Sequence, residues 1–349
     1  MTSVLRLLVP DQAQISGGGV FNARLAEALT VRGWAVDERR IAGDWPSPEP
    51  EQRAAVAEAL RGEGPALVDG LIGSVCPDEL EAAVAAGVSV IVLVHLPLPA
   101  ERGLPEDEQA RLAASECRAL HAATAIAVPS HWASADLARR YDLTAHVVVP
   151  GVEPAPVAEG SEPPQLLMLA ALTPVKNHAT LLAALGCLGD LDWQATLAGP
   201  HRDPQTVAEV RRLGRTAAVE DRITLPGELT GTALDTVWQA TDLLLVPSWT
   251  ETYGLVVTEA LARGIPAIVA RGTGAAEALA GGPGVPESDL PGALADPGDP
   301  AEWARLVRGR LTDPVRRDRW RRAALERRES LRTWSDAARD LECVLEELS

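Results

Sequence analysis

Residues 242–270 read DLLLVPSWTETYGLVVTEALARGIPAIVA, and this stretch contains the pattern that decides the fold. A short apolar run at 242–246 is followed by a polar loop, a segment of helical period and a second apolar run at 266–269. A strand, a helix and another strand in this order are typical of the βαβ unit of a parallel sheet. Because ligands bind beyond the carboxyl ends of such strands, we expect the loop between run and helix to carry chemistry.

The same alternation of apolar runs and helical segments extends over most of the chain. In the first half, strands are expected at 4–9, 35–38, 66–68, 89–94, 124–128 and 145–149, and helices at 20–32, 52–61 and 106–122. In the second half, further strands are expected at 166–170, 193–198 and 222–225. The pattern predicts an α/β protein with two doubly wound, Rossmann-like domains.

A change in composition separates the two halves. The sequence PGVEPAPVAEGSEPP at 150–164 is rich in Pro and Glu and shows no periodicity, which is typical of an interdomain linker. We therefore expect an N-terminal domain at 1–150, a linker at 151–164, a C-terminal domain at 165–330 and a terminal helix within 331–349. The Arg-rich stretch 316–332 also contains acidic residues and is interpreted as a solvated helix face.

The composition limits the classes of partner. With 349 residues, 46% hydrophobic and 23% charged, the chain is expected to fold throughout. A net charge of −17 argues against standing association with nucleic acid or anionic lipid. No run of about 18 apolar residues is present, and residues 1–14 lack the features of a signal peptide. A cytoplasmic location is expected, without stable membrane insertion.

The loop after the strand at 242–246 has the composition of a site for a sugar nucleotide. Backbone N–H groups of Thr252, Tyr253, Gly254 and Leu255 would lie at a helix N-terminus, which suits a phosphate or sugar hydroxyls. Glu259 lies about one and a half turns into the helix, where its two oxygens can accept hydrogen bonds from a vicinal diol such as ribose. Glu251 can accept hydrogen bonds from a second pair of hydroxyl groups, on a sugar. The alternative is that both glutamates are solvent-exposed charges.

These residues resemble a known family. Glu251, seven intervening residues, Glu259 and then Ala-Leu-Ala-x-Gly-x-Pro are similar to the E-x7-E motif of retaining GT-B glycosyltransferases of family 4, the group 1 transferases. Other matching segments are GGGV at 17–20, PSHWASADLARRY at 129–141, VVVPGV at 147–152, TPVKNHATLLAAL at 173–185 and TW at 333–334. The resemblance covers nearly the whole chain, and it implies that the terminal helix crosses back onto the N-terminal domain.

The resemblance implies a role for each matching residue of the C-terminal domain. Glu251 would contact donor-sugar hydroxyls, Glu259 would contact the ribose, and backbone groups near Tyr253 and Gly254 would meet the sugar and phosphate. Lys176 would meet the donor diphosphate. It is the single lysine of the sequence and lies just beyond a predicted strand end, where a compact ammonium can stabilise phosphate charge.

The N-terminal domain would contribute glycines and a histidine. Gly18 and Gly19 lie between the first predicted strand and its helix, and the resemblance places Gly19 next to the diphosphate. His95 ends the fourth predicted strand and matches a family histidine near the donor sugar and acceptor. In the C-terminal domain, base recognition would involve the loop at 226–229, which includes Leu229. A flexible turn and a structural histidine remain the alternative interpretations.

One position departs from the family pattern. An arginine usually precedes the family lysine by five residues, and this sequence has Ala171 there. We hypothesise that Arg202, which follows another strand end, replaces it; an ordinary exposed arginine is the alternative. The family resemblance implies retention by front-face attack, with the leaving phosphate helping to deprotonate the acceptor. No metal or other cofactor is expected, and Asp190-Leu191-Asp192 is interpreted as a turn before a strand.

The predicted function is transfer of a sugar, of hexosyl or N-acetylhexosaminyl type, from a nucleoside-diphosphate-sugar to an acceptor hydroxyl. With 12 Arg against 20 Asp and Glu, residues 1–150 favour a soluble acceptor. Two alternatives remain. One is a degenerate, non-catalytic sugar-nucleotide binder, suggested by Ala171. The other is a NAD-dependent oxidoreductase, because Gly17, Gly19 and Asp37 approximate the Rossmann spacing although Asn22 replaces its third glycine.

Overall fold

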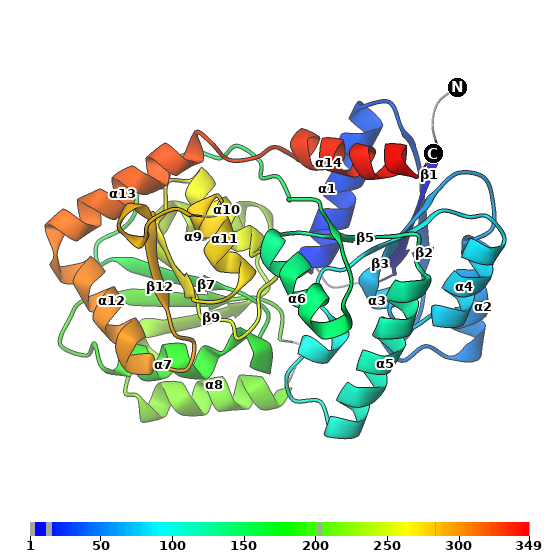
Figure 1. Ribbon diagram of the computed structural model, residues 1–349. Coiled ribbons are helices and arrows are strands. Elements are labelled where there is room, and N and C mark those ends of the chain that lie inside the picture. Colours follow the sequence, from blue (N-terminus) through cyan, green and yellow to red (C-terminus); the bar gives the residue numbers. More distant parts are fainter. Residues whose placement is uncertain (1–3, 12–15, 202–203, 283, 349) are drawn as a thin grey trace. The chain divides into compact units, whose positions relative to one another are not determined.

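The computed structural model describes residues 4–11, 16–201, 204–282 and 284–348. The chain divides into two compact units (Figure 1). The first unit comprises residues 1–151 and 332–349, and the second comprises residues 152–331. Each unit has its own parallel sheet and its own core, and each is described by itself below.

The first unit contains a six-stranded sheet in the order β2-β1-β3-β4-β5-β6, and all its strand pairs are parallel. The strands are β1 (Val4–Pro10), β2 (Ala35–Ile41), β3 (Ala66–Asp69), β4 (Val90–Leu93), β5 (Ala125–Val128) and β6 (His146–Val147). From β1 the chain goes to β2 on one side and to β3 on the other. The direction in which the chain adds strands to the sheet therefore changes at the β1/β3 boundary. Open α/β sheets bind ligands at such a switch point.

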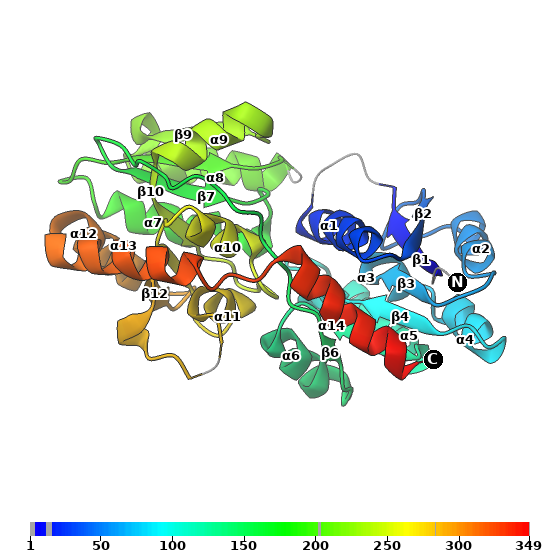
Figure 2. The same cartoon turned by 90° about the horizontal axis from the view of Figure 1, so that it is seen from above.

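Helices cover the faces of this sheet (Figure 2). They are α1 (Gly17–Val31), α2 (Pro50–Ala59), α3 (Gly70–Gly73), α4 (Pro77–Ala85), α5 (Glu106–Ala122), α6 (His131–Tyr141) and α14 (Trp334–Glu347), with the 3₁₀ turn η1 (Leu98–Ala100). Every residue of β3, β4 and β5 is buried, which explains their continuous apolar sequences.

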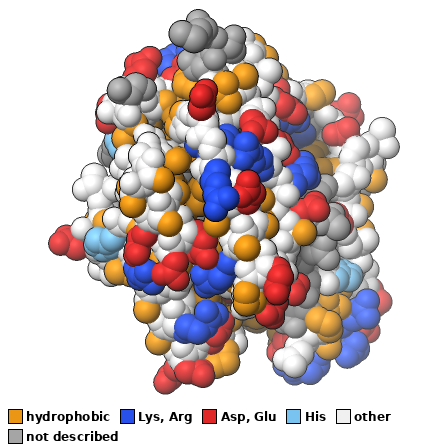
Figure 3. Space-filling model, turned by 90° about the vertical axis from the view of Figure 1, so that its right-hand side faces the viewer, with side chains coloured by type: hydrophobic (Ala, Val, Ile, Leu, Met, Phe, Trp, Pro, Cys, Tyr) orange, Lys and Arg blue, Asp and Glu red, His pale blue; other side chains and the backbone are white. Residues whose placement is uncertain are grey.

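The edge strand β2 differs from the central strands, because it carries the charged sequence Asp-Glu-Arg-Arg at 37–40. Arg39 forms an ion pair with Asp37 at 2.7 Å, and Arg40 forms one with Glu38 at 2.8 Å. Charges on an edge strand oppose pairing with another sheet. Figure 3 shows that basic and acidic side chains are interspersed on the face it presents, so no single sign of charge dominates there.

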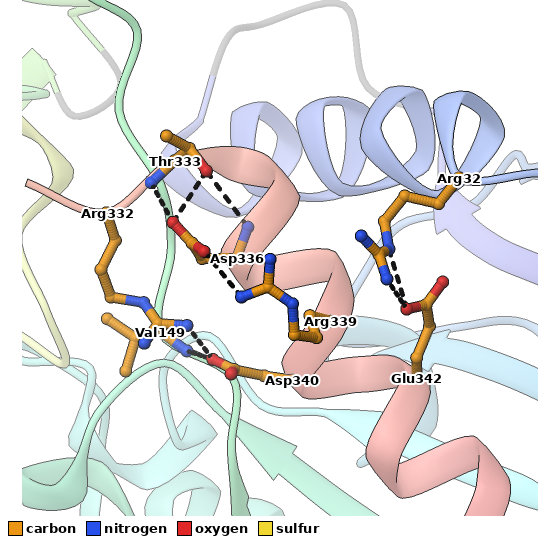
Figure 4. A network of polar contacts seen from close by, with 8 residues as sticks. All are labelled: Arg32, Val149, Arg332, Thr333, Asp336, Arg339, Asp340 and Glu342. Atoms are coloured by element: carbon orange, nitrogen blue, oxygen red, sulfur yellow. Dashed lines mark hydrogen bonds and ion pairs between the residues drawn. The ribbon is translucent and has the colours of Figure 1, made fainter.

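Helix α14 returns from the end of the second unit to pack on α1 (Figure 2). Trp334 packs edge-on against Phe21, with ring centroids 5.7 Å apart. The Arg32 guanidinium donates to Glu342, and the Thr333 and Asp336 side chains form a capping box that begins the helix (Figure 4). The terminal helix that the resemblance implied is therefore part of the first unit.

The second unit contains another six-stranded parallel sheet, in the order β12-β11-β10-β7-β8-β9. Its strands are β7 (Gln165–Leu169), β8 (Gln194–Ala198), β9 (Ile223–Gly227), β10 (Thr241–Val246), β11 (Ala267–Ala270) and β12 (Gly292–Ala295). When the strands are numbered along the chain, this is the strand order of the Rossmann fold. The direction in which strands are added changes at the β7/β10 boundary.

The helices of the second unit connect these strands. They are α7 (His178–Gly186), α8 (Pro204–Thr216), α9 (Gly231–Ala240), α10 (Leu255–Ala262), α11 (Gly274–Ala280), α12 (Pro300–Thr312) and α13 (Pro314–Arg328), with the 3₁₀ turns η2 (Pro174–Lys176), η3 (Glu220–Arg222) and η4 (Glu287–Asp289). None of the helices among the described residues of either unit combines the length and the apolar composition that a membrane span requires.

The Arg-rich stretch is a solvated helix face only in part, because two of its arginines bond to backbone carbonyl groups. Arg328 donates from Nε to the Ala262 carbonyl oxygen at 2.7 Å, and Arg321 donates from Nη1 to the Gly264 carbonyl oxygen at 2.7 Å. These carbonyls lie at the carboxyl end of α10, where unpaired C=O groups attract cations. Two of the arginines therefore help to fix α10, the helix that follows the Glu251 loop.

The Pro-rich segment after the first unit has no helix or strand, but it is packed onto the second unit. Ala155 and Ala158 are buried, and the Ala158 N–H donates to the Arg263 carbonyl oxygen at 3.0 Å. The N–H groups of Glu159 and Gly160 both donate to the Gln239 carbonyl oxygen at 3.0 Å. Residues 152–164 therefore have a defined path along the second unit.

Candidate functional site

The central feature of the second unit is an ion pair at the β7/β10 boundary, where the direction of strand addition changes. Lys176 lies in η2, beyond the carboxyl end of β7, and Glu251 lies in the loop beyond β10. Strands β7 and β10 are neighbours in the sheet, so their following loops meet. The Lys176 Nζ lies 2.6 Å from the Glu251 Oε2, and both side chains keep partial exposure, 25% and 16%. The structure thus brings together these two predicted residues.

Asn177 holds the Lys176 loop in place. It has a left-handed backbone with φ of 59°, and its side-chain amide donates to the carbonyl oxygens of Pro247 at 3.0 Å and Pro297 at 2.8 Å. The Trp249 N–H donates to the Val175 carbonyl oxygen at 2.9 Å. Loops after β7, β10 and β12 are thereby joined. This role of Asn177 was not predicted from the sequence, although asparagine favours such a backbone conformation.

Gly254 is the N-cap residue of α10, and its lack of a side chain leaves room for Glu251. Its φ is +85°, and a Cβ at this position would lie 3.3 Å from the Glu251 Cγ. No described residue accepts a hydrogen bond from the N–H of Gly254 or Leu255, as is usual at a helix N-terminus. These two N–H groups are unpaired donors at the place where the sequence predicts a cradle for a phosphate or sugar hydroxyls, and that role stays a prediction.

Thr252 and Tyr253 are buried, with exposed fractions of 7% and 6%. Their backbone packs closely against the next loop, because the Gly274 N–H donates to the Glu251 carbonyl oxygen at 2.6 Å. A side chain at Gly274 would collide with the Thr252 backbone. The loop that carries Glu251 is therefore rigidly supported.

Glu259 lies on the second turn of α10, separate from the Lys176–Glu251 pair. The Glu259 side chain is partly exposed to solvent. Protein surrounds the rest of it, and this desolvation raises the pKa of its carboxyl group, while the nearby Arg263 charge acts in the opposite direction. No described residue donates a hydrogen bond to its carboxylate. Arg263 stacks over the Trp238 ring at 4.8 Å. The carboxylate thus keeps its hydrogen-bonding capacity for a ligand.

The other predicted residues of this unit have no contact with the ion pair that the structure describes. Leu229 lies two residues beyond the end of the edge strand β9 and is half-buried, with no direct contact to the ion pair among the described residues. Arg202, proposed as the substitute for the family arginine, falls outside the described residues. Ala171 follows β7 and offers no charge.

In the first unit, the glycines adjoin the predicted histidine. Helix α1 begins at Gly17, three residues earlier than expected, and the Gly19 N–H donates to the Ser16 Oγ at 3.0 Å. The prediction that these glycines precede the helix is therefore wrong; they form its first turn, which their low helix propensity concealed. A Cβ at Gly18 would lie 2.8 Å from the His95 Cδ2, so glycine makes room for the ring.

Two further residues of this cluster were not predicted. His95 Nε2 lies 2.9 Å from the Asn22 Oδ1 and 3.5 Å from the Asp69 Oδ2, and the Asn22 Nδ2 donates to the same Asp69 oxygen at 2.5 Å. Asn22 and Asp69 are buried. From the sequence, Asn22 was considered only as a deviation from a dinucleotide motif. Its buried side chain bonded to Asp69 and His95 explains why a polar residue stands there.

A buried glutamate supports the segment that follows His95. Glu116 on α5 is fully buried and accepts hydrogen bonds from the Leu98 N–H at 3.1 Å, the Ser74 hydroxyl at 3.0 Å and the Tyr141 hydroxyl at 2.7 Å. Burial raises the pKa of Glu116, although these hydrogen bonds oppose the rise. Its helical position had given no signal of this role.

The acidic, histidine and cysteine side chains do not form a metal centre in the part of the chain that is described. Across residues 4–11, 16–201, 204–282 and 284–348, no group of three His, Cys, Asp or Glu side chains gathers in a way that could hold a metal ion. Asp190 pairs with Arg308 at 2.7 Å and precedes β8, so it lies at the amino-terminal edge of the sheet. This placement agrees with the interpretation of the Asp-x-Asp sequence as a turn.

Comparison with solved structures defines the class of the fold. Sucrose-phosphate synthase from Thermosynechococcus elongatus superposes with a TM-score of 0.80 at 21% identity, covering 99% of both chains. HepE from Anabaena, in complex with UDP-glucose, gives a TM-score of 0.78 at 15% identity, also covering 99% of both chains. With its two Rossmann-like units and its returning terminal helix, the chain has the GT-B fold.

The family follows from the sequence itself. Residues 152–327 match the model of the family "Glycosyl transferases group 1", and the chain belongs to this family. The D-inositol 3-phosphate glycosyltransferase of Corynebacterium efficiens is 29% identical over 274 residues, which cover 71% of this chain and 62% of that protein. The protein of the same name from Corynebacterium diphtheriae is 34% identical over 146 residues, 42% of this chain and 32% of that protein. The matches thus span less than two thirds of these relatives' length.

Proposed function

We propose that the chain is a retaining glycosyltransferase that moves a sugar from a nucleoside diphosphate to an acceptor hydroxyl. The observation that carries the proposal is the 2.6 Å contact between Lys176 and Glu251 at the β7/β10 boundary. A cation and a carboxylate held side by side can bind a molecule with an anionic and a hydroxyl-bearing part. Sugar nucleotides have this composition.

In the proposed complex, Lys176 binds the diphosphate. An ammonium has three N–H donors, and the contact with Glu251 occupies one of them. The others remain for phosphate oxygens, and the Gly254 and Leu255 N–H groups at the start of α10 add two neutral donors. Lys176 and α10 would together stabilise the charge that develops on the leaving phosphate, in place of the missing family arginine at Ala171.

In the proposed complex, the carboxylates of Glu251 and Glu259 would bind hydroxyl groups of the donor. Lys176 contacts the Glu251 Oε2, and the Ser248 hydroxyl lies 3.4 Å from the same atom. No described residue bonds to Oε1, so this oxygen can accept from a donor-sugar hydroxyl. Glu259, whose carboxylate is without a hydrogen bond from the described residues, would accept from the two ribose hydroxyls.

The proposed reaction exchanges one bond to the anomeric carbon. The bond from this carbon to the phosphate oxygen breaks, and a bond to the acceptor oxygen forms on the same face of the sugar. The acceptor proton passes to the released phosphate. Because the ammonium and the helix N-terminus supply the positive charge, we propose that the transfer needs no metal ion or other cofactor. For Gly18, Gly19 and His95 of the first unit, a role in binding substrate stays an expectation of the family resemblance.

The choice of first substrates follows from the relatives. HepE was solved with UDP-glucose, and the curated relatives are named for D-inositol 3-phosphate. We therefore propose a UDP-hexose donor and a small polyol phosphate acceptor as the first pair to test, with a cytoplasmic site of action. The excess of acidic residues in 1–150 supports such a soluble acceptor over a lipid.

The proposal is tested by measuring UDP release and by determining the anomeric configuration of the product by NMR, with EDTA present. Release and product should vanish in Lys176→Ala and Glu251→Gln, and they should persist in Arg305→Ala, which removes an exposed cation on α12. An inverted product would refute retention. Tight sugar-nucleotide binding without turnover would instead support the degenerate binder. Reduction of NAD by the wild-type chain would support the oxidoreductase.

A further inference from the structure

Arg263 lies one helical turn beyond Glu259 but does not pair with its carboxylate. Glu259 lies within α10 and Arg263 is the C-cap residue of that helix, four positions later. At this spacing a glutamate and a basic residue meet on one helix face and commonly form an ion pair. Among the described residues, however, the Glu259 carboxylate forms no ion pair and accepts no hydrogen bond. The Arg263 Nη1 donates instead to the Glu259 main-chain carbonyl oxygen, at 2.9 Å.

The Trp238 ring holds the rest of the Arg263 guanidinium. The guanidinium carbon lies 4.8 Å from the centroid of this ring, a distance at which an aromatic face attracts a cation. Trp238 lies on α9 and is buried, so its ring is fixed by the core. A planar guanidinium can stack on the indole and donate to a carbonyl oxygen at the same time. Two contacts that do not involve the Glu259 carboxylate therefore determine where Arg263 lies.

The Pro-rich segment holds the ends of the two helices beside each other. The Ala158 N–H donates to the Arg263 carbonyl oxygen, and the Glu159 and Gly160 N–H groups donate to the Gln239 carbonyl oxygen, all at 3.0 Å. Gln239 directly follows Trp238 near the end of α9. Backbone hydrogen bonds thus bring Arg263 next to Trp238 without any ligand.

Arg263 supplies the charge that acts on Glu259. Desolvation raises the pKa of the Glu259 carboxyl group, and the Arg263 charge lowers it. On α9, Asp235 acts on Arg263 rather than on Glu259. On α13, Arg321 and Arg328 bond to carbonyl oxygens at the carboxyl end of α10. The charged residues of the other elements packed against α10, Glu277 on α11 and Asp242 on β10, do not shift the pKa of Glu259.

We propose that Arg263 is a positioning residue whose charge compensates that of Glu259 from a distance, so that both carboxylate oxygens stay open to the two ribose hydroxyls of the donor. The role rests on the proposed transfer from a sugar nucleotide. A direct ion pair with Arg263 occupies carboxylate oxygens that a vicinal diol needs. Without a nearby cation, the desolvated carboxyl group takes up a proton more readily, and its hydroxyl then donates instead of accepting. Stacking on Trp238 keeps the charge close while the guanidinium stays off the carboxylate.

Two substitutions of Arg263 separate its charge from its position. Arg263→Met removes the charge and leaves an unbranched chain on the Trp238 ring, and Arg263→Gln is a second neutral variant. Arg263→Lys keeps the charge but lacks the planar group, so its ammonium is free to pair with Glu259 at the i, i+4 spacing. Arg322→Met, which removes an exposed cation on α13, is the matched control.

Calorimetry measures the affinity of each protein for UDP and for 2′-deoxy-UDP at a series of pH values. The ratio of the two affinities reports the 2′-hydroxyl contact, because a merely structural change weakens both ligands alike. The wild type and Arg322→Met should prefer UDP about tenfold, as expected for one hydrogen bond to a charged group. In Arg263→Met and Arg263→Gln this preference should be lost at a higher pH than in the wild type. In Arg263→Lys it should be reduced at every pH.

Two results would overturn the positioning role. One is a preference for UDP that depends on pH in the neutral variants as it does in the wild type, since the charge of Arg263 would then be irrelevant. The other is a full preference in Arg263→Lys, which would show that keeping the cation off the carboxylate has no effect. Equal weakening of both ligands in the neutral variants would also contradict the proposal, because it indicates a structural role alone.

A titration without ligand tests the electrostatic half separately. It follows the ¹³C carboxyl signal of Glu259 in protein labelled at the glutamate side chains, assigned by its loss in Glu259→Gln. The signal should titrate at a higher pH in Arg263→Met than in the wild type, and an unchanged titration would overturn the role of the Arg263 charge. If the wild type binds no UDP, the proposed function fails and this titration alone decides. If it binds UDP without preference over the deoxy compound, the proposed donor class stands and the ribose role of Glu259 is wrong.

Discussion

The Asn177 side-chain amide donates a hydrogen bond to the Pro247 carbonyl oxygen at 3.0 Å, and this bond joins the segment that carries Lys176 to the segment that carries Glu251. The same amide group also reaches the Pro297 carbonyl oxygen at 2.8 Å. One side chain thus connects three loops at the carboxyl edge of the second sheet. Two of these loops carry Lys176 and Glu251, whose side chains are 2.6 Å apart.

Asn177→Ala should therefore destabilise the protein by about 2–4 kcal/mol. The two hydrogen bonds of the amide are lost, at about 1 kcal/mol each, and alanine adds strain of about 1 kcal/mol in the left-handed backbone. The Pro297 carbonyl oxygen keeps one donor, the Thr180 hydroxyl at 2.9 Å, whereas the Pro247 carbonyl oxygen loses its side-chain donor. Asn177→Gly loses the same hydrogen bonds without the strain, so its loss should be smaller by about 1 kcal/mol. Urea unfolding measures both variants. Equal stability of the two variants would contradict the role of backbone conformation, and wild-type stability of both would contradict the role of the amide.

His178 should make the stability of the protein depend on pH. Its ring is buried, and neither ring nitrogen has a hydrogen-bond partner among the described residues. Burial, aided by the charge of Lys176, lowers the pKa of His178 to about 4. The unfolded chain therefore binds a proton before the native state does, so this group's contribution is complete above about pH 6.5 and is lost as pH falls toward 4.

The loss should amount to about 3 kcal/mol in the free energy of unfolding between pH 6.5 and 4. His178→Leu should remove this part of the pH dependence and leave the stability at pH 7 equal or higher, since an unpaired polar group is removed. Urea unfolding at a series of pH values measures it. His121→Leu, which changes an exposed histidine, is the matched control and should keep the wild-type slope. An unchanged slope in His178→Leu would show that other groups cause the acid instability.

Thr333 should stabilise the first turn of the terminal helix α14. Its hydroxyl accepts from the Asp336 N–H at 3.2 Å, and the Asp336 carboxylate accepts in return from the Thr333 N–H at 2.9 Å (Figure 4). Thr333→Ala should cost about 1 kcal/mol and should speed hydrogen exchange in α14, whereas Thr333→Ser should retain the cap. Exchange measured by mass spectrometry would contradict this role if α14 were equally protected in all three proteins.

The sequence was sufficient to predict the α/β class and most strands, because a strand buried on both faces shows as an apolar run. The strand β12 was not predicted, since its sequence Gly-Ala-Leu-Ala has small residues and little β-propensity. The start of α1 was misplaced because its first turn is made of glycines. Both errors concern segments whose conformation comes from packing and capping, which local composition does not report.

The candidate site was predictable where the strand-end rule applies. Lys176, Glu251 and Gly254 follow the ends of two strands, and the structure brings them together. Asn22 and Asp69 escaped prediction because they contact a third residue, His95, which is distant in sequence. A cluster of three side chains is a property of the folded arrangement, and no spacing in the chain encodes it.

The central claim is that Lys176 binds the diphosphate and Glu251 binds the sugar of the same donor. Calorimetric titration of UDP and of UDP-glucose into the wild type, Lys176→Ala and Glu251→Gln tests it most directly. Lys176→Ala should weaken the binding of both ligands by tenfold or more, on the order expected for a charged hydrogen bond. Glu251→Gln should weaken UDP-glucose while UDP binds at least as well as to the wild type. Unchanged UDP binding by Lys176→Ala would contradict the claim.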